Sequence, residues 1–243
     1  MSTLSGGPNI ITDGLVLYLD AANRQSYVSG STTWTDISRG GMNGTLVNGP
    51  TFSTSSGGSI VFDGVNDLVN TSVATQGITA FSTDVVFRTT TTYDTSQYYN
   101  CPSICGTAQG SGISGDWLVA VKNGFLVSYD ELTGGSNNIN LNAYVSDDKW
   151  YYLQATKTTS GIVTYYLNGV QILQLSGRTS ALRTTSLTST IYGTNWMVGS
   201  AFWIDAAYRN FQGQIALNRF YNRALSANEV LQNYNTTKTR YGL

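Results

Sequence analysis

The sequence predicts an all-β fold, a jelly-roll sandwich of two antiparallel sheets followed by one short C-terminal helix. Short apolar or alternating segments recur along the 243 residues and are separated by Gly, Asn and Ser, a spacing typical of antiparallel strands joined by tight turns. The chain has only 3 Pro residues, so Gly and Asn are expected to form the turns. Hydrophobic residues make up 41% of the chain, which is enough for a substantial core.

The expected strands and hairpins follow from apolar runs and two-residue alternation. They cover residues 15–20, 59–64, 68–73, 81–89, 116–130, 150–158, 161–175, 196–202 and 211–223. Asn-Gly dipeptides are strong hairpin signals, because both residues tolerate a positive φ. These dipeptides occur at residues 43–44, 48–49, 123–124 and 168–169. Residues 90–115 show no clear pattern and are expected to form a loop.

The segment FYNRALSANEVLQNYN at residues 220–235 has a helical rather than a β pattern. Ser226 and Glu229 match a capping box, in which each side chain bonds the backbone N–H of the other residue. A helix of this length is marginal alone, so we expect residues 227–236 to dock on the end of a sheet. The residues that can share its apolar face are Val230, Leu231 and Tyr234.

One domain is expected, since no Pro-rich linker, charge block or change in composition divides the chain. We assign residues 14–243 to this domain and residues 1–13 to an N-terminal arm or anchor. The first twenty residues lack a basic region followed by a long apolar run, so we expect no signal peptide. No stretch approaches the roughly 18 apolar residues that a membrane-spanning helix needs. A soluble protein made in a cytoplasm is expected.

Charged residues make up 11% of the chain, against roughly 25% in an average domain. Thr, Ser, Asn, Gly and Tyr replace them, as on the surfaces of many extracellular and virion proteins. The net charge is −1, and the 13 Lys and Arg residues form no run. This distribution argues against a nucleic-acid partner, which a basic surface would attract.

Four segments match sequence motifs of a known family. The first two are a Trp-x-Asp…Asn-Gly-Thr opening at residues 33–52 and a Phe-Asp-Gly-x-Asx-Asp bend at 57–69. The third, at 149–172, is a strand that begins with Trp and is followed by an Asn-Gly turn, and the fourth is the closing segment at 211–235. Together they resemble laminin G-like, concanavalin A-like lectin/glucanase domains. The opening NIITDGLVLYLDAANRQSY also resembles the start of tailed-phage virion proteins that carry this domain.

Catalytic groups are sparse. A glycoside hydrolase needs a pair of carboxyl groups around the scissile bond, and the glucanase branch of the resembled family carries Glu-x-Asp-x-x-Glu on one strand. This chain has only Glu131 and Glu229, and neither lies in such a pattern. Without any His, no Ser-His-Asp or Cys-His arrangement is possible. We therefore expect a protein that is not an enzyme.

The two cysteines, Cys101 and Cys105, lie close together in the segment CPSICG. A disulfide framework needs more cysteines, and a zinc site needs further ligands. They are expected to be reduced or locally bridged thiols, with a redox role as the alternative.

A sugar-binding site would combine flat aromatic rings with amide or hydroxyl groups, because a pyranose has an apolar face and hydroxyl edges. The segment AFWIDAAYRNF at residues 201–211 is the best single patch. Packing in the core or on the surface is the alternative for each aromatic. The candidate ligand-binding residues are Trp203, Asp205, Tyr208, Arg209, Tyr98, Tyr99 and Trp117.

The bend FDGVND contains Asp63, Asn66 and Asp67, whose oxygens are of the type that Ca²⁺ prefers. The resembled domains often hold Ca²⁺, which is the one cofactor considered. The alternative is a turn stabilised by Asx hydrogen bonds.

The resemblance and the lack of catalytic groups lead to the expected function. We expect a non-enzymatic virion protein, such as a capsid decoration protein, head fibre or tail-associated protein, located on the virion and made in the host cytoplasm. Its expected partners are copies of itself, other virion proteins and host-surface glycans, with no nucleic acid or membrane. A lectin or adhesin outside a virion is the alternative, followed by a glycan-cleaving enzyme.

Overall fold

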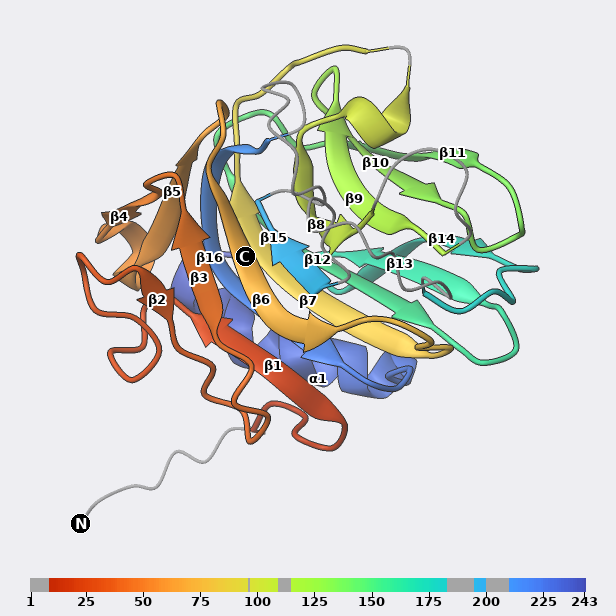
Figure 1. Ribbon diagram of the computed structural model, residues 1–243, viewed down its shortest axis with the longest axis horizontal. Coiled ribbons are helices and arrows are strands. Elements are labelled where there is room, and N and C mark those ends of the chain that lie inside the picture. Colours follow the sequence, from red (N-terminus) through yellow and green to blue (C-terminus); the bar gives the residue numbers. More distant parts are fainter. Residues whose placement is uncertain (1–8, 96, 109–114, 183–194, 200–209) are drawn as a thin grey trace.

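The computed structural model shows two antiparallel β-sheets packed face to face, with one α-helix on the outer side of the first sheet (Figure 1). The structure describes residues 9–95, 97–108, 115–182, 195–199 and 210–243. The predicted all-β sandwich with a short C-terminal helix is confirmed.

The first sheet contains 8 strands. They are β1 (Leu15–Asp20), β4 (Thr51–Ser53), β5 (Ser59–Asp63), β7 (Phe81–Arg88), β12 (Trp150–Lys157), β13 (Val163–Leu167), β14 (Val170–Leu175) and β16 (Gln212–Tyr221). The order is β14-β13-β12-β7-β16-β5-β4, and β1 also pairs with β16. Strands from both ends of the sequence therefore lie at its centre.

The second sheet also has 8 strands. They are β2 (Thr33–Trp34), β3 (Gly44–Val47), β6 (Leu68–Ala74), β8 (Ser103–Thr107), β9 (Trp117–Lys122), β10 (Phe125–Asp130), β11 (Asn137–Tyr144) and β15 (Asn195–Val198). The order is β11-β10-β9-β8-β15-β6-β3-β2. Consecutive strands often change sheet, as in a jelly roll.

Two predicted Asn-Gly hairpins are confirmed. Asn123 and Gly124 have φ values of 51° and 81° and join β9 to β10. Asn168 and Gly169, with φ values of 50° and 78°, join β13 to β14. The turn at residues 48–49 also has positive φ, but it connects β3 with β4, which belong to different sheets.

The predicted turn at Asn43-Gly44 is wrong. Gly44 is the first residue of β3, and a Cβ atom there would come 2.6 Å from Cγ1 of Val69 on β6. Gly44 therefore leaves room for the Val69 side chain within the sheet, so this glycine serves packing and not a turn.

Several strands were missed by the sequence reasoning, among them β8 and β11. β8 lies within residues 90–115, the segment predicted to be a loop, and all its residues are buried, so it shows no alternation. β11 does alternate, with Ile139 and Leu141 buried. Its outward residues are mostly Asn, which is depleted in strands and typical of turns.

Both cysteines are buried free thiols, so the alternative of a local disulfide is wrong. Cys105 lies in β8 and belongs to the main core cluster. Cys101 directly follows a short 3₁₀ helix, η2 (Tyr98–Asn100). Burial raises the pKa of the Cys101 thiol to about 12, which keeps it protonated at neutral pH.

Stacked aromatic rings fill the space between the two sheets. The rings of Trp117 and Trp196 are 5.7 Å apart and 18° from parallel, and those of Phe81 and Phe220 are 5.8 Å apart. The indole N–H of Trp117 donates to the Tyr165 hydroxyl at 3.3 Å. Trp117, which the sequence suggested as a ligand-binding residue, is instead a fully buried core residue with no ring face open to a ligand.

The C-terminal helix, α1 (Ala227–Thr237), starts at the predicted capping box. The Ser226 hydroxyl accepts from the backbone N–H of Glu229 at 3.4 Å, and the Ser226 N–H donates to the Glu229 carboxylate at 2.8 Å. The 3₁₀ helix η3 (Lys238–Tyr241) follows directly. Within the ranges given above, no helix is both long and apolar enough to cross a membrane.

The helix docks on the face of the first sheet and not on its end (Figure 1). Its buried residues are Val230, Asn233 and Thr237, whereas Leu231 is exposed. The predicted apolar face is therefore wrong in part, because the helix buries two polar side chains against polar groups of the sheet.

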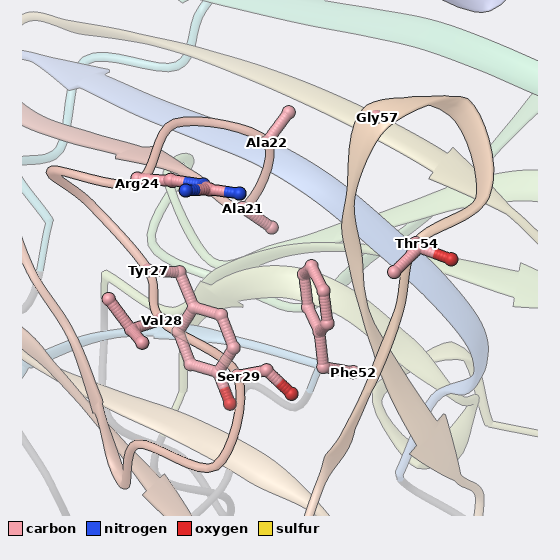
Figure 2. A pocket seen from close by; sticks show the side chains of 9 residues that line it. All are labelled: Ala21, Ala22, Arg24, Tyr27, Val28, Ser29, Phe52, Thr54 and Gly57. Carbon is pink, nitrogen blue, oxygen red and sulfur yellow. The ribbon is translucent and has the colours of Figure 1, made fainter.

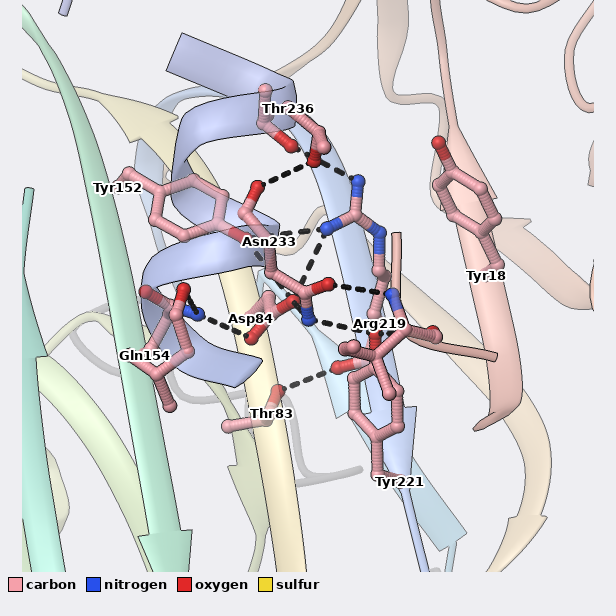
Figure 3. A network of polar contacts seen from close by, with 12 residues as sticks. Tyr18, Thr83, Asp84, Tyr152, Gln154, Arg219, Tyr221, Asn233 and Thr236 are labelled. Carbon is pink, nitrogen blue, oxygen red and sulfur yellow. Dashed lines mark hydrogen bonds and ion pairs between the residues drawn. The ribbon is translucent and has the colours of Figure 1, made fainter. Parts of the chain in front are cut away.

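Those polar groups form a buried network around Asp84 of β7 (Figure 3). Oδ2 of Asp84 accepts from Arg219 at 3.2 Å and from Asn233 at 3.0 Å. The Tyr152 hydroxyl donates to the same oxygen at 3.1 Å. A second nitrogen of Arg219 donates to the Thr237 hydroxyl at 3.1 Å. The network joins β7, β12, β16 and α1, and it fixes the helix on the sheet.

Candidate functional site

Exposed aromatic side chains gather at the turn between β9 and β10. Tyr93, Phe125 and Tyr144 are 42%, 41% and 48% exposed. Phe125 and Tyr144 are cross-strand partners on β10 and β11, and their ring centroids lie 5.3 Å apart at an angle of 79°. The Tyr93 carbonyl accepts from the backbone N–H of Asn123 at 2.8 Å, which fixes Tyr93 beside the same turn. We call these three side chains the aromatic rim.

A pocket of about 210 Å³ lies against Tyr93, and we call it the Tyr93 pocket. Its lining residues are Asp63, Gly64, Thr91, Tyr93, Pro102, Asn210 and Gln212. The polar groups among them are one carboxylate, two amides and two hydroxyls. A pocket of hydrogen-bonding groups with an exposed aromatic ring at its edge suits a sugar ligand.

Strand pairing and a tight bend position the polar groups of this pocket. Asp63 and Gln212 are paired residues of β5 and β16. The bend that follows β5 closes when the Val65 N–H donates to Asp63 Oδ1 at 2.8 Å. The Asn210 amide then donates to the Val65 carbonyl at 2.9 Å. Because each contact is local to a strand end, the pocket is built on the rigid part of the sandwich.

The contacts in this bend are those of the Asx turn that was the alternative to a calcium site. The Asp63 N–H donates to Asp67 Oδ2 at 3.0 Å, and the Asn66 N–H donates to Asp63 Oδ1 at 3.4 Å. Burial raises the pKa of Asp67. In the part of the chain that the structure describes, no three His, Cys, Asp or Glu side chains group as metal ligands would. Calcium at Asp63, Asn66 and Asp67 stays a prediction.

The predicted residues Tyr98 and Tyr99 lie in η2, over the outer face of β9 and β10. Both are partly buried, and the ring of Tyr99 meets that of Tyr129 edge to face at 5.4 Å. The Lys122 ammonium lies 5.8 Å from the centre of the Tyr98 ring. Lys122 also pairs with Phe125 across the hairpin, so the η2 tyrosines lie close to the aromatic rim.

The patch predicted at residues 201–211 lies largely outside the described residues. The predicted residues that lie outside the described ranges are Trp203, Asp205, Tyr208 and Arg209. The described residue that follows them, Asn210, lines the Tyr93 pocket.

Sequence reasoning missed all three residues of the aromatic rim. Tyr93 lies in the segment without a pattern, and Tyr144 ends a strand that was not recognised. Phe125 was assigned to a hairpin, and its position directly after Asn123-Gly124 was the available signal. An aromatic residue beside a tight hairpin turn lies at the end of the sheet, where its ring is only partly covered.

Neither glutamate is arranged as a catalytic acid. The Glu229 carboxylate lies 2.6 Å from the Arg223 guanidinium, whose hydrogen bond lowers the Glu229 pKa to about 2. Glu131 is buried and accepts from the hydroxyls of Tyr129 and Ser136 at 2.5 and 3.2 Å. Both carboxylates are therefore held in structural contacts.

Solved structures with the same fold include several binding domains. Domain 4 of AbnA, a GH43 extracellular arabinanase from Geobacillus stearothermophilus solved with arabinotriose, has a TM-score of 0.67 at 13% identity, over 92% of this chain and 100% of that domain. The binding domain of Paraclostridial Mosquitocidal Protein 1 has a TM-score of 0.64 at 17% identity, over 92% of this chain and 52% of that one.

A botulinum neurotoxin type C structure, from work on cell entry through two ganglioside molecules, has a TM-score of 0.60 at 15% identity. It is matched over 93% of this chain and 52% of its own, so this chain spans about half the length of the toxin domains. At these identities the likeness is one of fold.

No curated protein matches the sequence. A laminin G family model, described as the concanavalin A-like lectin/glucanases superfamily, matches residues 63–231. The match covers more than half of the chain, from the last residue of β5 through β16 to the first turn of α1. It agrees with the two stacked sheets, and the chain therefore belongs to the concanavalin A-like lectin/glucanases superfamily.

Proposed function

We propose that this protein is a non-catalytic carbohydrate-binding module whose ligand lies on the aromatic rim and in the Tyr93 pocket. The observation that carries the proposal is the exposed ring of Tyr93, which lines a pocket of amides, hydroxyls and a carboxylate and is bonded through its backbone to the hairpin that carries Phe125. A sugar can stack its apolar face on the rings, while its hydroxyls bond the polar groups. The arabinotriose complex of AbnA domain 4 supports a sugar ligand for this fold.

The size and charge of the site indicate the ligand class. The Tyr93 pocket, at about 210 Å³, is smaller than the roughly 300–1,000 Å³ of sites that enclose drug-sized molecules. It fits one sugar ring, with further rings lying across the aromatic rim. The Asp63 carboxylate accepts hydrogen bonds and repels anions, so hydroxyl-rich neutral sugars suit the site.

A glycan array followed by calorimetric titration of the best binder tests this proposal. Tyr93→Ala and Phe125→Ala should each weaken binding by about tenfold, since each removes a stacking surface worth roughly 1 kcal/mol or more. Leu231→Ala is the matched control, because Leu231 is similarly exposed but lies on α1. An array without a binder, or rim variants that bind like the control, would contradict the proposal.

We further propose that this module is a virion accessory protein that adheres to host-surface glycans as part of an oligomer. The support is the low charge of the chain and the resemblance of residues 9–27 to openings of tailed-phage virion proteins. Mass spectrometry of purified particles, with size-exclusion chromatography and light scattering, tests this role. Absence from the particles, together with a monomeric state, would contradict it.

A further inference from the structure

A second pocket, of about 480 Å³, lies beside the edge strand β4 (Figure 2). Its floor includes the rings of Tyr27 and Phe52, whose centroids are 5.3 Å apart at an angle of 34°. Val28 lies at its margin and is 63% exposed. None of these residues belongs to the aromatic rim or the Tyr93 pocket, so this is a separate site.

The floor of the second pocket is held firmly. The Tyr27 hydroxyl donates to the Ser31 carbonyl at 3.0 Å, and the Tyr27 N–H donates to the Asn23 carbonyl at 2.8 Å. Tyr27 belongs to the main core cluster, and Phe52 packs against that cluster from β4. The pocket therefore offers a preformed apolar surface, which lowers the entropy lost on binding.

Arg24 supplies a positive charge to this surface. It is exposed, it lines the pocket, and no hydrogen bond or ion pair engages its side chain among the described residues. The described arginines that do have a carboxylate partner are Arg88, Arg178, Arg219, Arg223 and Arg240. The guanidinium of Arg24 is thus available to an external anion.

We infer that the second pocket binds an acidic sugar, whose carboxylate pairs with Arg24 and whose apolar ring face lies on Phe52. Arg can bind a carboxylate through two parallel N–H···O bonds, and the planar fork fixes the orientation of the ligand. The volume lies within the range of small-ligand sites and fits one or two sugar rings. The two sites differ in charge, because Arg24 lines the second pocket whereas Asp63 lines the Tyr93 pocket and favours neutral sugars there.

Calorimetric titration of the whole protein with sialyllactose, a galacturonic acid trimer and lactose tests this inference. At least one acidic sugar should bind about tenfold more tightly to the native protein than to Arg24→Ala. Arg24→Lys should restore only part of the affinity, because it keeps the charge but loses the fork. Val28→Asp should weaken acidic-sugar binding by repulsion, and higher salt should weaken it as well.

Arg39→Ala is the matched control, because Arg39 is an exposed arginine that lines a different pocket and also has no described partner. It should leave acidic-sugar binding unchanged. Binding of only one of the two acidic sugars supports the inference and identifies the source of the carboxylate. No acidic-sugar binding, equal affinity for lactose, or equal loss in Arg24→Ala and Arg39→Ala would overturn it. Tyr93→Ala should not affect this affinity, so failure of the proposed rim site leaves the inference standing.

Discussion

The guanidinium of Arg219 lies 3.2 Å from the carboxylate of Asp84, and each side chain is only 1% exposed. Arg219 also lies 4.7 Å from the centre of the Tyr18 ring on β1. Two central strands of the first sheet are thereby joined to each other and, through Asn233 and Thr237, to α1. Helix docking thus depends on a buried ion pair.

Removing one partner of this pair should destabilise the protein strongly. Arg219→Leu is expected to lower the free energy of unfolding by about 3–5 kcal/mol, because it leaves the Asp84 carboxylate buried without its cation. Urea denaturation measures the change. The control Arg39→Ala should stay within about 0.5 kcal/mol of the native value, since Arg39 is exposed. The double variant Asp84→Leu/Arg219→Leu should lose less than the two single changes combined, and strict additivity would show that the charges are not coupled.

The Glu229 contact with Arg223 should make stability depend on pH in the acid range. The Glu229 pKa is lowered from 4.5 to about 2, so between these values the unfolded chain binds more protons than the folded one. The stabilisation is complete above pH 4.5 and is lost as the pH falls toward 2. Its size should be below about 1 kcal/mol, because the pair is partly exposed. Glu229→Gln should remove this component from the pH profile of unfolding. If the pH dependence of the unfolding free energy were the same in Glu229→Gln as in the native protein, other carboxylates would be its cause.

The two thiols should be inert in the folded protein. Cys101 and Cys105 are buried, and burial raises the pKa of both, so the reactive thiolate is scarce. A thiol reagent should label neither residue in native buffer and both in denaturant. Rapid labelling of the native protein would instead favour the redox role.

The hairpin glycine at residue 169 should be essential for helix packing. A Cβ atom at Gly169 would lie 2.5 Å from Cδ1 of Tyr234 on α1, in a backbone with φ of 78°. Gly177 has a similar φ of 76°, but no atom lies within 4 Å of a Cβ placed there. Gly169→Ala should therefore lose more stability than Gly177→Ala in thermal unfolding, by about 1–3 kcal/mol for the clash. Equal losses would show that Tyr234 moves aside freely.

Much of the architecture follows from local patterns in the sequence. Alternating or apolar runs predicted β7, β12 and β16, which form the centre of the first sheet. Ser226 and Glu229 predicted the start of α1, because a capping box involves only residues three positions apart. The sequence patterns gave wrong predictions for Gly and Asn, because both residue types occur in turns and also within strands. Gly44 makes room for the Val69 side chain where a turn was expected, and the Asn residues of β11 lie on an exposed strand face.

The sequence by itself determined the all-β class, the capped C-terminal helix and the scarcity of catalytic groups, since composition and short-range spacing are enough for these. Only the tertiary structure decided that Trp117 is a core residue and that Asn233 and Thr237 are buried partners of the ion pair. It also brought Asp63 and Tyr93 to one pocket. These outcomes depend on which distant strands pair and which face each side chain takes, and a single sequence carries no direct record of such contacts.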